Sequence, residues 1–398
     1  MNTGFKEAVA HVRDELPDAH VDVIVEPAYA PLHGEGATVH VVDAIGDLSA
    51  LREVVLGLMR ERRIDRIVAP SERSMLPGGY LRSVLGFPGI GFDLANRFSN
   101  KAVMKRTLSA RKVQVADFRP VASLSDVAAA AEEIGWPVVL KPAFGAGAMH
   151  TFCLGSHREL RELAESPSAA KLAAATCLLM VEKYIDMDGE YHCNGIVQKG
   201  EVTFASVSRY REPVLRMMTG KSGVSLSLPD SHPDVAPILD LHRRAVTALG
   251  LDDGVTHLEI FKTATGFLVG EIACRPGGGH IPVHVLLQSG VDLVRAFFAS
   301  ELGQPVAEIP GRSPRETVVV SAHLPERSGR VTRVSAAEEL TGIDGVLSAS
   351  VSARVGDHIG SYVHSTTATG EVHFEVDSAD QADDKLGEIM SRYVLEVE

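Results

Sequence analysis

The chain has 398 residues, of which 45% are hydrophobic and 23% are charged. This length exceeds what one hydrophobic core usually organises, and the composition is that of a folded globular protein, so a small peptide, a fibre and a disordered chain are excluded. The 39 basic and 52 acidic residues give a net charge of −13, which argues against nucleic acid as the main partner because phosphate binding needs a basic surface.

The first hundred residues alternate between predicted strands and helices. Short apolar runs predict strands and amphipathic patterns predict helices. The expected order is strand 21–25, strand 39–42, helix 48–60, strand 64–69 and helix 75–85. Such alternation predicts a parallel sheet flanked by helices, so we expect an α/β domain over residues 1–99.

A second group of predicted elements surrounds a loop of small residues. Strands at 138–140 and 151–154 enclose the segment 143–148, which reads Ala-Phe-Gly-Ala-Gly-Ala and predicts a hairpin lid with a mobile tip. We expect this lid to occupy residues 100–185. Its other predicted elements are the helices 100–110, 126–134 and 159–175 and the strand 177–181.

The remainder divides into a central region over 186–305 and a β-rich extension over 306–398, which ends in a helix near 381–393. The boundary is predicted where Pro310, Gly311, Ser313 and Pro314 interrupt the pattern. The central region is expected to contain the antiparallel strands 190–197 and 201–208, an irregular segment 209–229, the helix 233–249, the strands 256–262 and 267–273, and the helix 291–302.

The cysteine content and the apolar runs indicate the compartment. The four cysteines are widely spaced and form no CxxC pair, which favours reduced thiols over disulfides or a zinc site. The amino terminus carries charges every few residues and lacks the apolar core of a signal peptide. The longest uncharged apolar run, 172–181, is shorter than the about 20 residues that a membrane helix needs. We therefore expect a cytoplasmic protein without a membrane partner.

Two glutamates are predicted to face each other on a hairpin. A three-residue loop at 264–266, with its glycine in the left-handed conformation, would place Thr263 opposite Phe267 and Glu259 opposite Glu271. Carboxylates so placed lie about 5 Å apart at Cβ and repel each other unless a cation lies between them. A hard divalent ion such as Mg²⁺ suits this arrangement. Two solvated glutamates on a surface hairpin are the alternative.

Lys141 follows an apolar strand and precedes Gly145 and Gly147, a pattern that suits a phosphate cradle of one cation and unobstructed backbone amides. A simple turn is the alternative. The dinucleotide fingerprint is excluded because the third glycine and the following helix are missing. The segment 220–222 reads Gly-Lys-Ser, but Leu215 stands where a P-loop needs its first glycine, so a P-loop is excluded as well.

In their order and spacing, these features resemble the ATP-grasp superfamily of carboxylate-amine ligases. The resemblance covers about residues 64–305, and the segment 271–282, EIACRPGGGHIP, is most similar to the branch that joins amino acids or peptides. It implies an ATP-grasp fold, ATP, and one or two Mg²⁺ ions, with Mn²⁺ as an acceptable substitute. The matching landmarks are Lys101 after Asn100, Lys141, the segment 182–185, Glu190, Glu259, Glu271 and Arg275.

The resemblance also implies a role for each landmark. Lys141 and Arg275 are the expected catalytic residues, because they would offset charge on the nucleotide and on the acyl phosphate. The remaining expected roles are phosphate binding by Lys101, Gly145 and Gly147, adenine binding by Glu182, Lys183, Tyr184 and Ile185, ribose binding by Glu190, and metal binding by Glu259 and Glu271.

Substrate recognition is weakly encoded. Gly277 and Gly278 would let the backbone approach the acyl phosphate beside Arg275, and His280 follows this glycine run. Arg211 would pair with a substrate carboxylate, for which a solvated surface position is the alternative. Glu72 follows the predicted strand 64–69, where ligands collect in open sheets, and helix capping is its alternative role.

The implied reaction joins a small-molecule carboxylate to an amine through an acyl phosphate, with release of ADP and phosphate, and a homodimer is compatible with the sequence. The main alternative within the same fold is a carboxylase that activates bicarbonate. One departure from the family pattern matters: Ala273 stands where many members carry an asparagine metal ligand, which makes a catalytically silent nucleotide-binding protein the other alternative.

Overall fold

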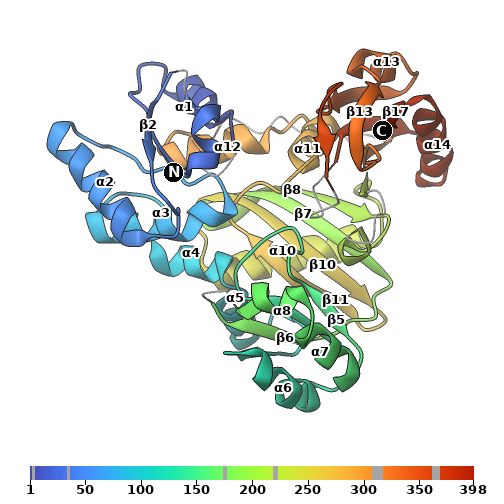
Figure 1. The fold of residues 1–398 in the computed structure, drawn as a ribbon, viewed down its shortest axis with the longest axis horizontal. Helices are drawn as coiled ribbons and strands as arrows, with labels where there is room; N and C mark the ends of the chain where they lie inside the picture. Colours follow the sequence, from blue (N-terminus) through green and yellow to red (C-terminus); the bar gives the residue numbers. More distant parts are fainter. Residues whose placement is uncertain (2–4, 34–35, 174–176, 218–222, 307–316, 361–367) are drawn as a thin grey trace.

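The computed structural model describes residues 1, 5–33, 36–173, 177–217, 223–306, 317–360 and 368–398. Its mixture of helices and sheets confirms the predicted α/β class. Figure 1 shows the amino-terminal region in blue, the lid in teal and green below it, and the large central sheet between the lid and the carboxyl-terminal region in orange and red.

The amino-terminal region is smaller in strand content than predicted. It comprises α1 (Ala8–Glu15), β1 (Asp22–Val25), η1 (Pro27–Leu32), β2 (Thr38–Val41), α2 (Leu48–Glu61), α3 (Glu72–Leu85) and α4 (Phe92–Ser99), and β1 pairs with β2 in parallel as expected. The prediction of a strand at 64–69 is wrong, because the backbone of this segment forms hydrogen bonds with side chains and not with a neighbouring strand. Arg82 Nε donates to the carbonyl of Ile67 (3.0 Å), and the amide of Ala69 donates to Glu301 Oε2 (3.2 Å).

The lid has its own sheet and its own core. Its elements are α5 (Lys101–Ala110), β3 (Phe118–Val121), η2 (Leu124–Asp126), α6 (Val127–Ile134), β4 (Val138–Pro142), β5 (Phe152–Leu154), α7 (His157–Ala164), α8 (Pro167–Ala173) and β6 (Leu179–Lys183), with strand order β3-β6-β4-β5.

The helices of the lid differ from the prediction in one place. The single helix predicted at 159–175 is two helices, because Pro167 cannot continue the hydrogen bonding of α7. Residues 174–176 lie outside the described residues. Asn100 caps α5 by accepting from the amides of Ala102 and Val103.

The central region is organised by an eight-stranded sheet of order β11-β10-β7-β8-β9-β12-β16-β14. Its elements are β7 (Gly189–Gln198), β8 (Glu201–Tyr210), α9 (Val214–Met217), β9 (Val224–Ser227), α10 (Val235–Leu249), β10 (Gly254–Thr263), β11 (Gly266–Ala273), α11 (Ile281–Ser289) and α12 (Leu293–Leu302). The irregular segment predicted at 209–229 therefore contains a strand, β9, whose alternation of serine with apolar residues is too short to stand out. The helix α11 was also not predicted.

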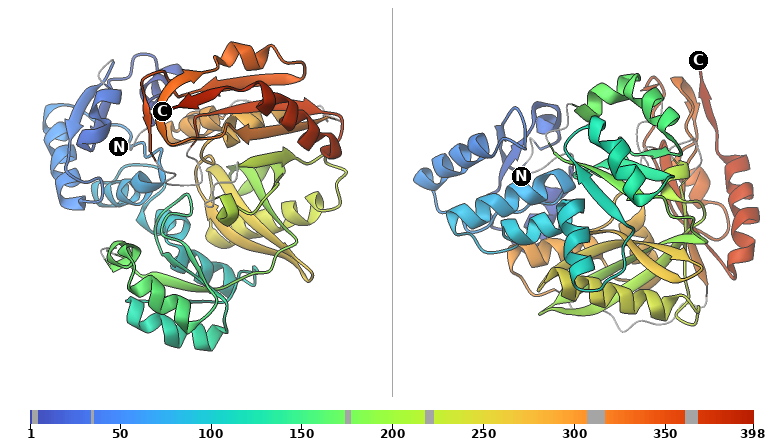
Figure 2. Two further views of the ribbon diagram at one scale, coloured as in Figure 1. Left: turned by 45° about the vertical axis from the view of Figure 1, so that its right-hand side comes forward. Right: turned by 90° about the horizontal axis from the view of Figure 1, so that it is seen from below.

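The carboxyl-terminal region extends the same sheet. It comprises β12 (Val318–His323), β13 (Gly329–Val334), α13 (Ala337–Thr341), β14 (Val346–Val351), β15 (His358–Ile359), β16 (Gly370–Val376), η3 (Ala379–Gln381), α14 (Ala382–Arg392) and β17 (Leu395–Val397). Strand β12 pairs with β9, so this region is joined to the central one by backbone hydrogen bonds. Figure 2 shows it as an orange and red layer beside the yellow strands. The predicted boundary at 310–314 lies outside the described residues.

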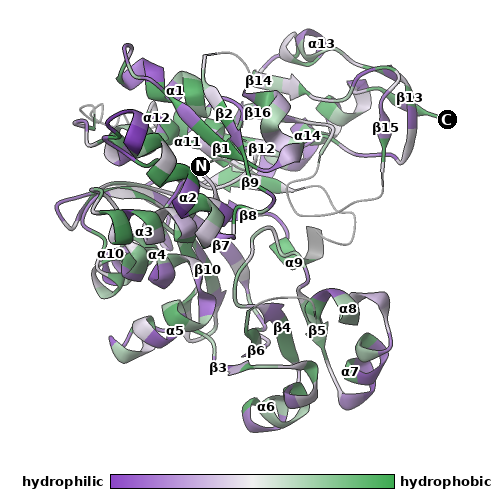
Figure 3. Cartoon of the chain, turned by 60° about the vertical axis from the view of Figure 1, so that its left-hand side comes forward, coloured by the Kyte–Doolittle hydropathy of each residue, from purple (hydrophilic) through white to green (hydrophobic). Residues whose placement is uncertain are grey.

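Hydropathy follows this layering. In Figure 3 the strands of the lid and of the central sheet carry green, hydrophobic segments, whereas outward helices such as α2 and α7 show purple, hydrophilic ones. In α7 the buried residues are Leu160 and Leu163, which pack on the lid core. Within the described residues no single helix is long and apolar enough to cross a membrane, and only the pair α11 and α12, bent by 105°, meets the length and composition test together.

Candidate active site

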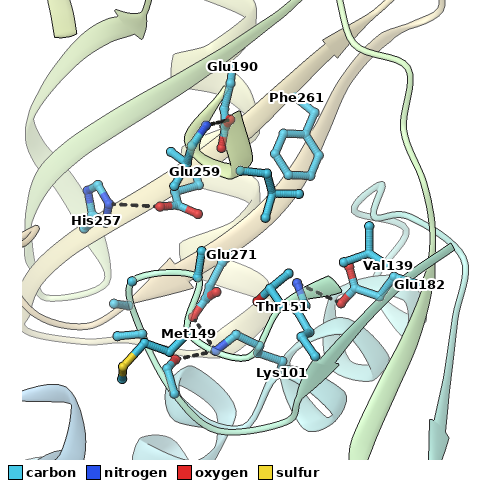
Figure 4. A pocket seen from close by; sticks show the side chains of 18 of the residues that line it. Lys101, Val139, Met149, Thr151, Glu182, Glu190, His257, Glu259, Phe261 and Glu271 are labelled. Carbon is cyan, nitrogen blue, oxygen red and sulfur yellow. Dashed lines mark hydrogen bonds and ion pairs between the residues drawn. The ribbon is translucent and has the colours of Figure 1, made fainter. Parts of the chain in front are cut away.

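A cleft of about 400 Å³ lies between the lid and the central sheet. Figure 4 shows side chains from both walls pointing into it. Most of the predicted site residues line this cleft, and the structure therefore brings together segments that are far apart in the sequence. The predicted residues that line it are Lys101, Lys141, Gly145, Gly147, Glu182, Lys183, Tyr184, Ile185, Glu190, Glu259, Glu271, Arg275, Gly278 and His280.

Glu182 forms ion pairs with two lysines at the base of the lid, the buried Lys105 and the partly exposed Lys141. Its carboxylate lies 3.1 Å from Lys141 Nζ and 3.4 Å from Lys105 Nζ. Burial alone would raise the pKa of Glu182, but the two lysines hold it below its ordinary value. Lys105 was not predicted as a site residue, although its position one helical turn after Lys101 on α5 is a signal that it shares the same face. The Glu182 carboxylate therefore orients Lys141 toward the cleft.

Lys101 links the lid loop to the central sheet. Its Nζ lies 3.0 Å from Glu271 Oε1 and donates to the carbonyl of Gly145 at 2.6 Å. Figure 4 shows the ion pair between Lys101 and Glu271. Its position at the start of α5, after the cap Asn100, aims the side chain at the cleft. One lysine thus contacts both the predicted phosphate loop and a predicted metal ligand.

The predicted pair of opposed carboxylates is present. Glu259 on β10 pairs with Glu271 on β11 in the sheet register. The predicted loop is nevertheless wrong: Thr263 pairs with Gly266, which leaves a two-residue loop, and a bulge at Gly270 restores the register before Glu259. A Cβ at position 270 would lie 2.9 Å from the ring of Phe261. A side chain at position 270 would therefore require the Phe261 ring to move, and the bulge keeps both carboxylates on one face.

The groups around Glu259 and Glu190 shift the pKa values of these two carboxyl groups in opposite directions. His257 Nε2 lies 3.7 Å from Glu259 Oε1. Burial alone would raise the pKa of Glu259, but the neighbouring His257 and the nearby lysines hold it below its ordinary value. Burial and the Glu259 carboxylate raise the pKa of Glu190 to about 8, and Glu190 Oε2 accepts from the amide of Val214 at 2.7 Å.

The donor set fits a hard divalent metal ion that is shared with phosphates. Two facing carboxylates supply the oxygen ligands, and Mg²⁺ characteristically binds a few carboxylates together with nucleotide phosphates and water. Among the described residues, no group of three or more His, Cys, Asp and Glu side chains could hold a metal ion alone. Ala273 lines the cleft opposite His257 in the register and offers only a methyl group.

Arg275 is fixed at the end of β11 by a residue from the amino-terminal region. Its Nε donates to Glu72 Oε2 at 2.8 Å, and a second guanidinium nitrogen donates to the carbonyl of Pro276 at 2.8 Å. Burial alone would lower the pKa of Arg275, but the Glu72 carboxylate raises it above its ordinary value. Glu72 does not line the cleft and contacts it through Arg275.

Two other predicted substrate residues lie outside the cleft lining. Arg211 pairs with Asp383 of α14 at 2.7 Å, so its guanidinium is directed to the carboxyl-terminal region. Gly277 packs against α11 and β10, where a Cβ would lie 2.8 Å from Ile281 Cγ2 and 2.9 Å from His257 Nδ1. Close packing thus accounts for this glycine. The Gly-Lys-Ser segment 220–222 lies outside the described residues.

The end of the cleft is lined by histidines from two regions. His280 packs its ring against His323 of β12, with centroids 4.7 Å apart and planes at 72°. Both residues are buried and line the cleft. Burial lowers the pKa of His323 to about 4 and that of His280 well below its ordinary value, so both rings are neutral near pH 7. His323 could not be found from the sequence, because nothing near it marks a site.

Comparisons with known proteins agree with this geometry. An ATP-grasp domain model matches residues 106–286, and a model of the L-amino acid ligase C-terminal domain 2 matches residues 323–398. An L-arginine-specific L-amino acid ligase of Bacillus subtilis is 33% identical over 381 residues, which cover 94% of this chain and 91% of the relative.

Solved structures show the same fold. The crystal structure of an L-amino acid ligase from Bacillus licheniformis superposes with a TM-score of 0.80 at 18% identity, covering 99% of this chain and 97% of that one. A phosphoribosylglycinamide synthetase from Anaerococcus prevotii has a TM-score of 0.70 at 15% identity, covering 100% and 98%. These likenesses confirm the predicted ATP-grasp fold. Together with the relative that matches along nearly the whole chain, they place the protein in the ATP-grasp family of L-amino acid ligases, enzymes that use ATP to join an amino-acid carboxylate to an amine.

Proposed function

We propose that this ligase activates its amino-acid carboxylate as an acyl phosphate in the cleft described above, with Mg²⁺ as the metal ion. The observation that carries the proposal is the convergence of Lys101, Lys141 and Arg275 on the facing carboxylates Glu259 and Glu271. Phosphoryl transfer depends mainly on positioning and on neutralising charge. Cations and metal ligands gathered at one point suit transfer of the terminal phosphate.

The opposite end of the cleft suits the nucleoside. The segment 182–185 crosses from β6 toward the central sheet, and Ala116, Val139 and Phe261 add apolar surface there. Because the Glu182 carboxylate holds Lys105 and Lys141, we assign adenine binding to the backbone of this segment. Lys183 directs its Nζ to the carbonyl of Gly135, 2.8 Å away. Glu190 is assigned to the ribose hydroxyls, with which its second carboxyl oxygen, the one that does not accept from Val214, can form a hydrogen bond.

The phosphate end is assigned to the two cleft lysines and the lid loop. Lys101 and Lys141 would offset the charge of the phosphates, and the backbone of Gly145 and Gly147 would approach them without obstruction. Glu259 and Glu271 would hold Mg²⁺, which supplies further neutralisation of the phosphate charge when it is bound. Lys101 would then exchange its contact with Glu271 for one with phosphate. The chain's own groups therefore bind, orient and exclude water.

Arg275 is assigned to the acyl phosphate. Its guanidinium, held by Glu72, can form two parallel hydrogen bonds with phosphate oxygens. The backbone of Gly278 lies at the same end of the cleft, and His280 follows it on the substrate side. The amine would attack the activated carbonyl there and release phosphate.

The products and the fate of an isotopic label test this proposal. With a matching amino acid and amine, ATP should yield ADP and phosphate, and oxygen-18 from the carboxylate should appear in that phosphate. Hydroxylamine in place of the amine should trap the intermediate as a hydroxamate. These results follow because the cations and carboxylates gather at the terminal phosphate.

Other outcomes have equally definite meanings. Stoichiometric AMP and pyrophosphate, or phosphate without label, would contradict the acyl-phosphate route. ADP release that bicarbonate stimulates in the absence of any amine would favour a carboxylase. Tight ATP binding without turnover across a matrix of amino acids and dipeptides would favour a silent nucleotide-binding protein, consistent with Ala273.

The lid loop should become ordered when nucleotide binds. Gly145 and Ala148 have φ values of +134° and +55°, and the loop lies against the cleft. Hydrogen exchange of residues 144–149 should slow by about tenfold or more when an ATP analogue and Mg²⁺ are added, because closure shields the backbone from water. The turn at 198–200, outside the cleft lining, is the internal control. Equal exchange with and without saturating nucleotide would mean that the loop does not close on phosphates.

A further inference from the structure

One carboxylate near the end of the cleft lacks a cationic partner. Other acids of the site are paired: Glu182 with Lys105 and Lys141, Glu271 with Lys101, and Glu72 with Arg275. Glu371 on β16, in contrast, makes no ion pair or side-chain hydrogen bond within the described part of the chain.

The strand register places Glu371 beside the cleft. Glu371 pairs with His323, which lines the cleft. The amide of Leu324 donates to the carbonyl of Gly370, so the neighbouring pair, His323 and Glu371, is not hydrogen-bonded. Side chains of such a pair are the closest across a sheet, with Cα atoms about 4.5 Å apart. The Glu371 side chain therefore lies next to His323, which forms part of the cleft wall.

The same face of β12 and β16 looks toward the catalytic region. Ser321 contacts His284 Nδ1 on α11 at 3.1 Å, and His373 Nε2 lies 3.4 Å from the carbonyl of His280. Because side chains two residues apart share a face of a strand, Glu371 points to the same side as His373. The opposite face, which includes Val320 and Phe374, is packed in the core of the carboxyl-terminal region.

The described neighbours of this carboxylate supply no positive charge. Burial lowers the pKa of both His323 and His373 to about 4, so these rings are neutral near pH 7. Burial also raises the pKa of Glu371, and no cationic group among the residues that the structure describes opposes that effect. A half-buried carboxylate in such a place gains most from a cation that arrives with the ligand.

We propose that Glu371 receives a cationic group of the amino-acid substrate at the histidine-lined end of the cleft. This inference rests on the proposed function, since it assigns the substrate end of the same cleft. Two groups have the required chemistry: the α-ammonium that every amino acid carries, and the side-chain cation of arginine or lysine. The group must stay charged during the reaction, which excludes the attacking amine because that amine has to be neutral.

The test compares Glu371→Gln with wild type after a screen of the common amino acids has identified those that stimulate ADP release. The matched control is Glu375→Gln, which removes the same charge from the same face of β16, farther from His323. The KM for the amino acid should rise by about tenfold or more in Glu371→Gln, the scale of a lost hydrogen bond between charged groups. The KM for ATP should stay within about twofold, which also reports intact folding.

The two sources of the cation give different patterns. If Glu371 binds the α-ammonium, leucine and arginine should both lose affinity, whereas 4-methylpentanoic acid, which is leucine without its ammonium, should bind both proteins equally in thermal-shift titrations with an ATP analogue. If Glu371 binds a side-chain cation, only arginine and lysine should lose affinity. Unchanged affinity for all amino acids, or an equal loss in Glu375→Gln, would overturn the proposal. A wild type that neither binds nor uses any amino acid would contradict the proposed function instead.

Discussion

Glu271→Gln should lower turnover by at least about 100-fold, the scale on which the loss of one electrostatic stabiliser acts in an active site. The change keeps the volume of the side chain and removes one of the two carboxylates that face each other across β10 and β11. It also removes the partner of Lys101, 3.0 Å away. Both losses act on the terminal phosphate of the nucleotide, so kcat should fall more than the affinity for the amino acid.

The affinity of the site for a divalent metal ion can be measured separately from activity. In Glu271→Gln, the Mn²⁺ concentration for half-saturation in the presence of an ATP analogue, followed by electron paramagnetic resonance, should rise by about tenfold or more because an anionic ligand is lost. Glu201→Gln, an exposed glutamate at the start of β8, is the control and should behave as wild type. Near-normal turnover and metal affinity in Glu271→Gln would remove this residue from the metal site.

Glu301→Ala should lower the free energy of unfolding by about 3–5 kcal/mol, the cost of leaving one partner of a buried ion pair without its counter-charge. Arg82 of α3 is 1% exposed, and its guanidinium pairs with Glu301 of α12. Glu301 Oε2 also accepts from the amide of Ala69. The variant therefore leaves a buried guanidinium without its counter-charge, although its hydrogen bonds to the carbonyls of Ile67 and Ile90 remain, and it leaves the amide of Ala69 without its acceptor.

Urea denaturation followed by circular dichroism measures this loss. Arg295→Ala is a control on the same helix, because Arg295, whose side chain is 61% exposed, forms a surface ion pair with Glu15 at 2.9 Å. Exposed pairs contribute about 1 kcal/mol or less, so this variant should unfold close to wild type. If the two variants were equally stable, the Arg82–Glu301 pair would not hold α12 to the amino-terminal region.

The opposed glutamates show how a correct prediction can rest on incorrect local detail. A three-residue loop was expected to set the register, whereas the structure has a two-residue loop and a bulge at Gly270. The two differences offset each other, since each shifts the pairing by one residue. Alternation of side chains predicts that both acids share a face, but a bulge depends on what packs against it, here the ring of Phe261.

The substrate end of the cleft was predictable only in part. His280 follows the glycine run that marks the end of β11, and the structure places it in the cleft. Arg211 was predicted from its charge alone, and in the structure it pairs with Asp383. The local sequence does not show whether an arginine will form an ion pair with a residue of a helix 172 positions later in the chain. Such a contact depends on the order of the strands in the sheet.

The sequence by itself determined the α/β class, the lid hairpin and the order of the nucleotide-site landmarks, because these depend on local periodicity, small-residue loops and the spacing of charged residues. Only the tertiary structure decided which groups meet across long separations: Lys105 with Glu182, Arg275 with Glu72, and His323 with His280. The physical reason is that strand order brings β12 beside β9 and thereby carries the carboxyl-terminal histidines to the cleft. Local patterns do not encode that order, since each strand can pair equally well with several others.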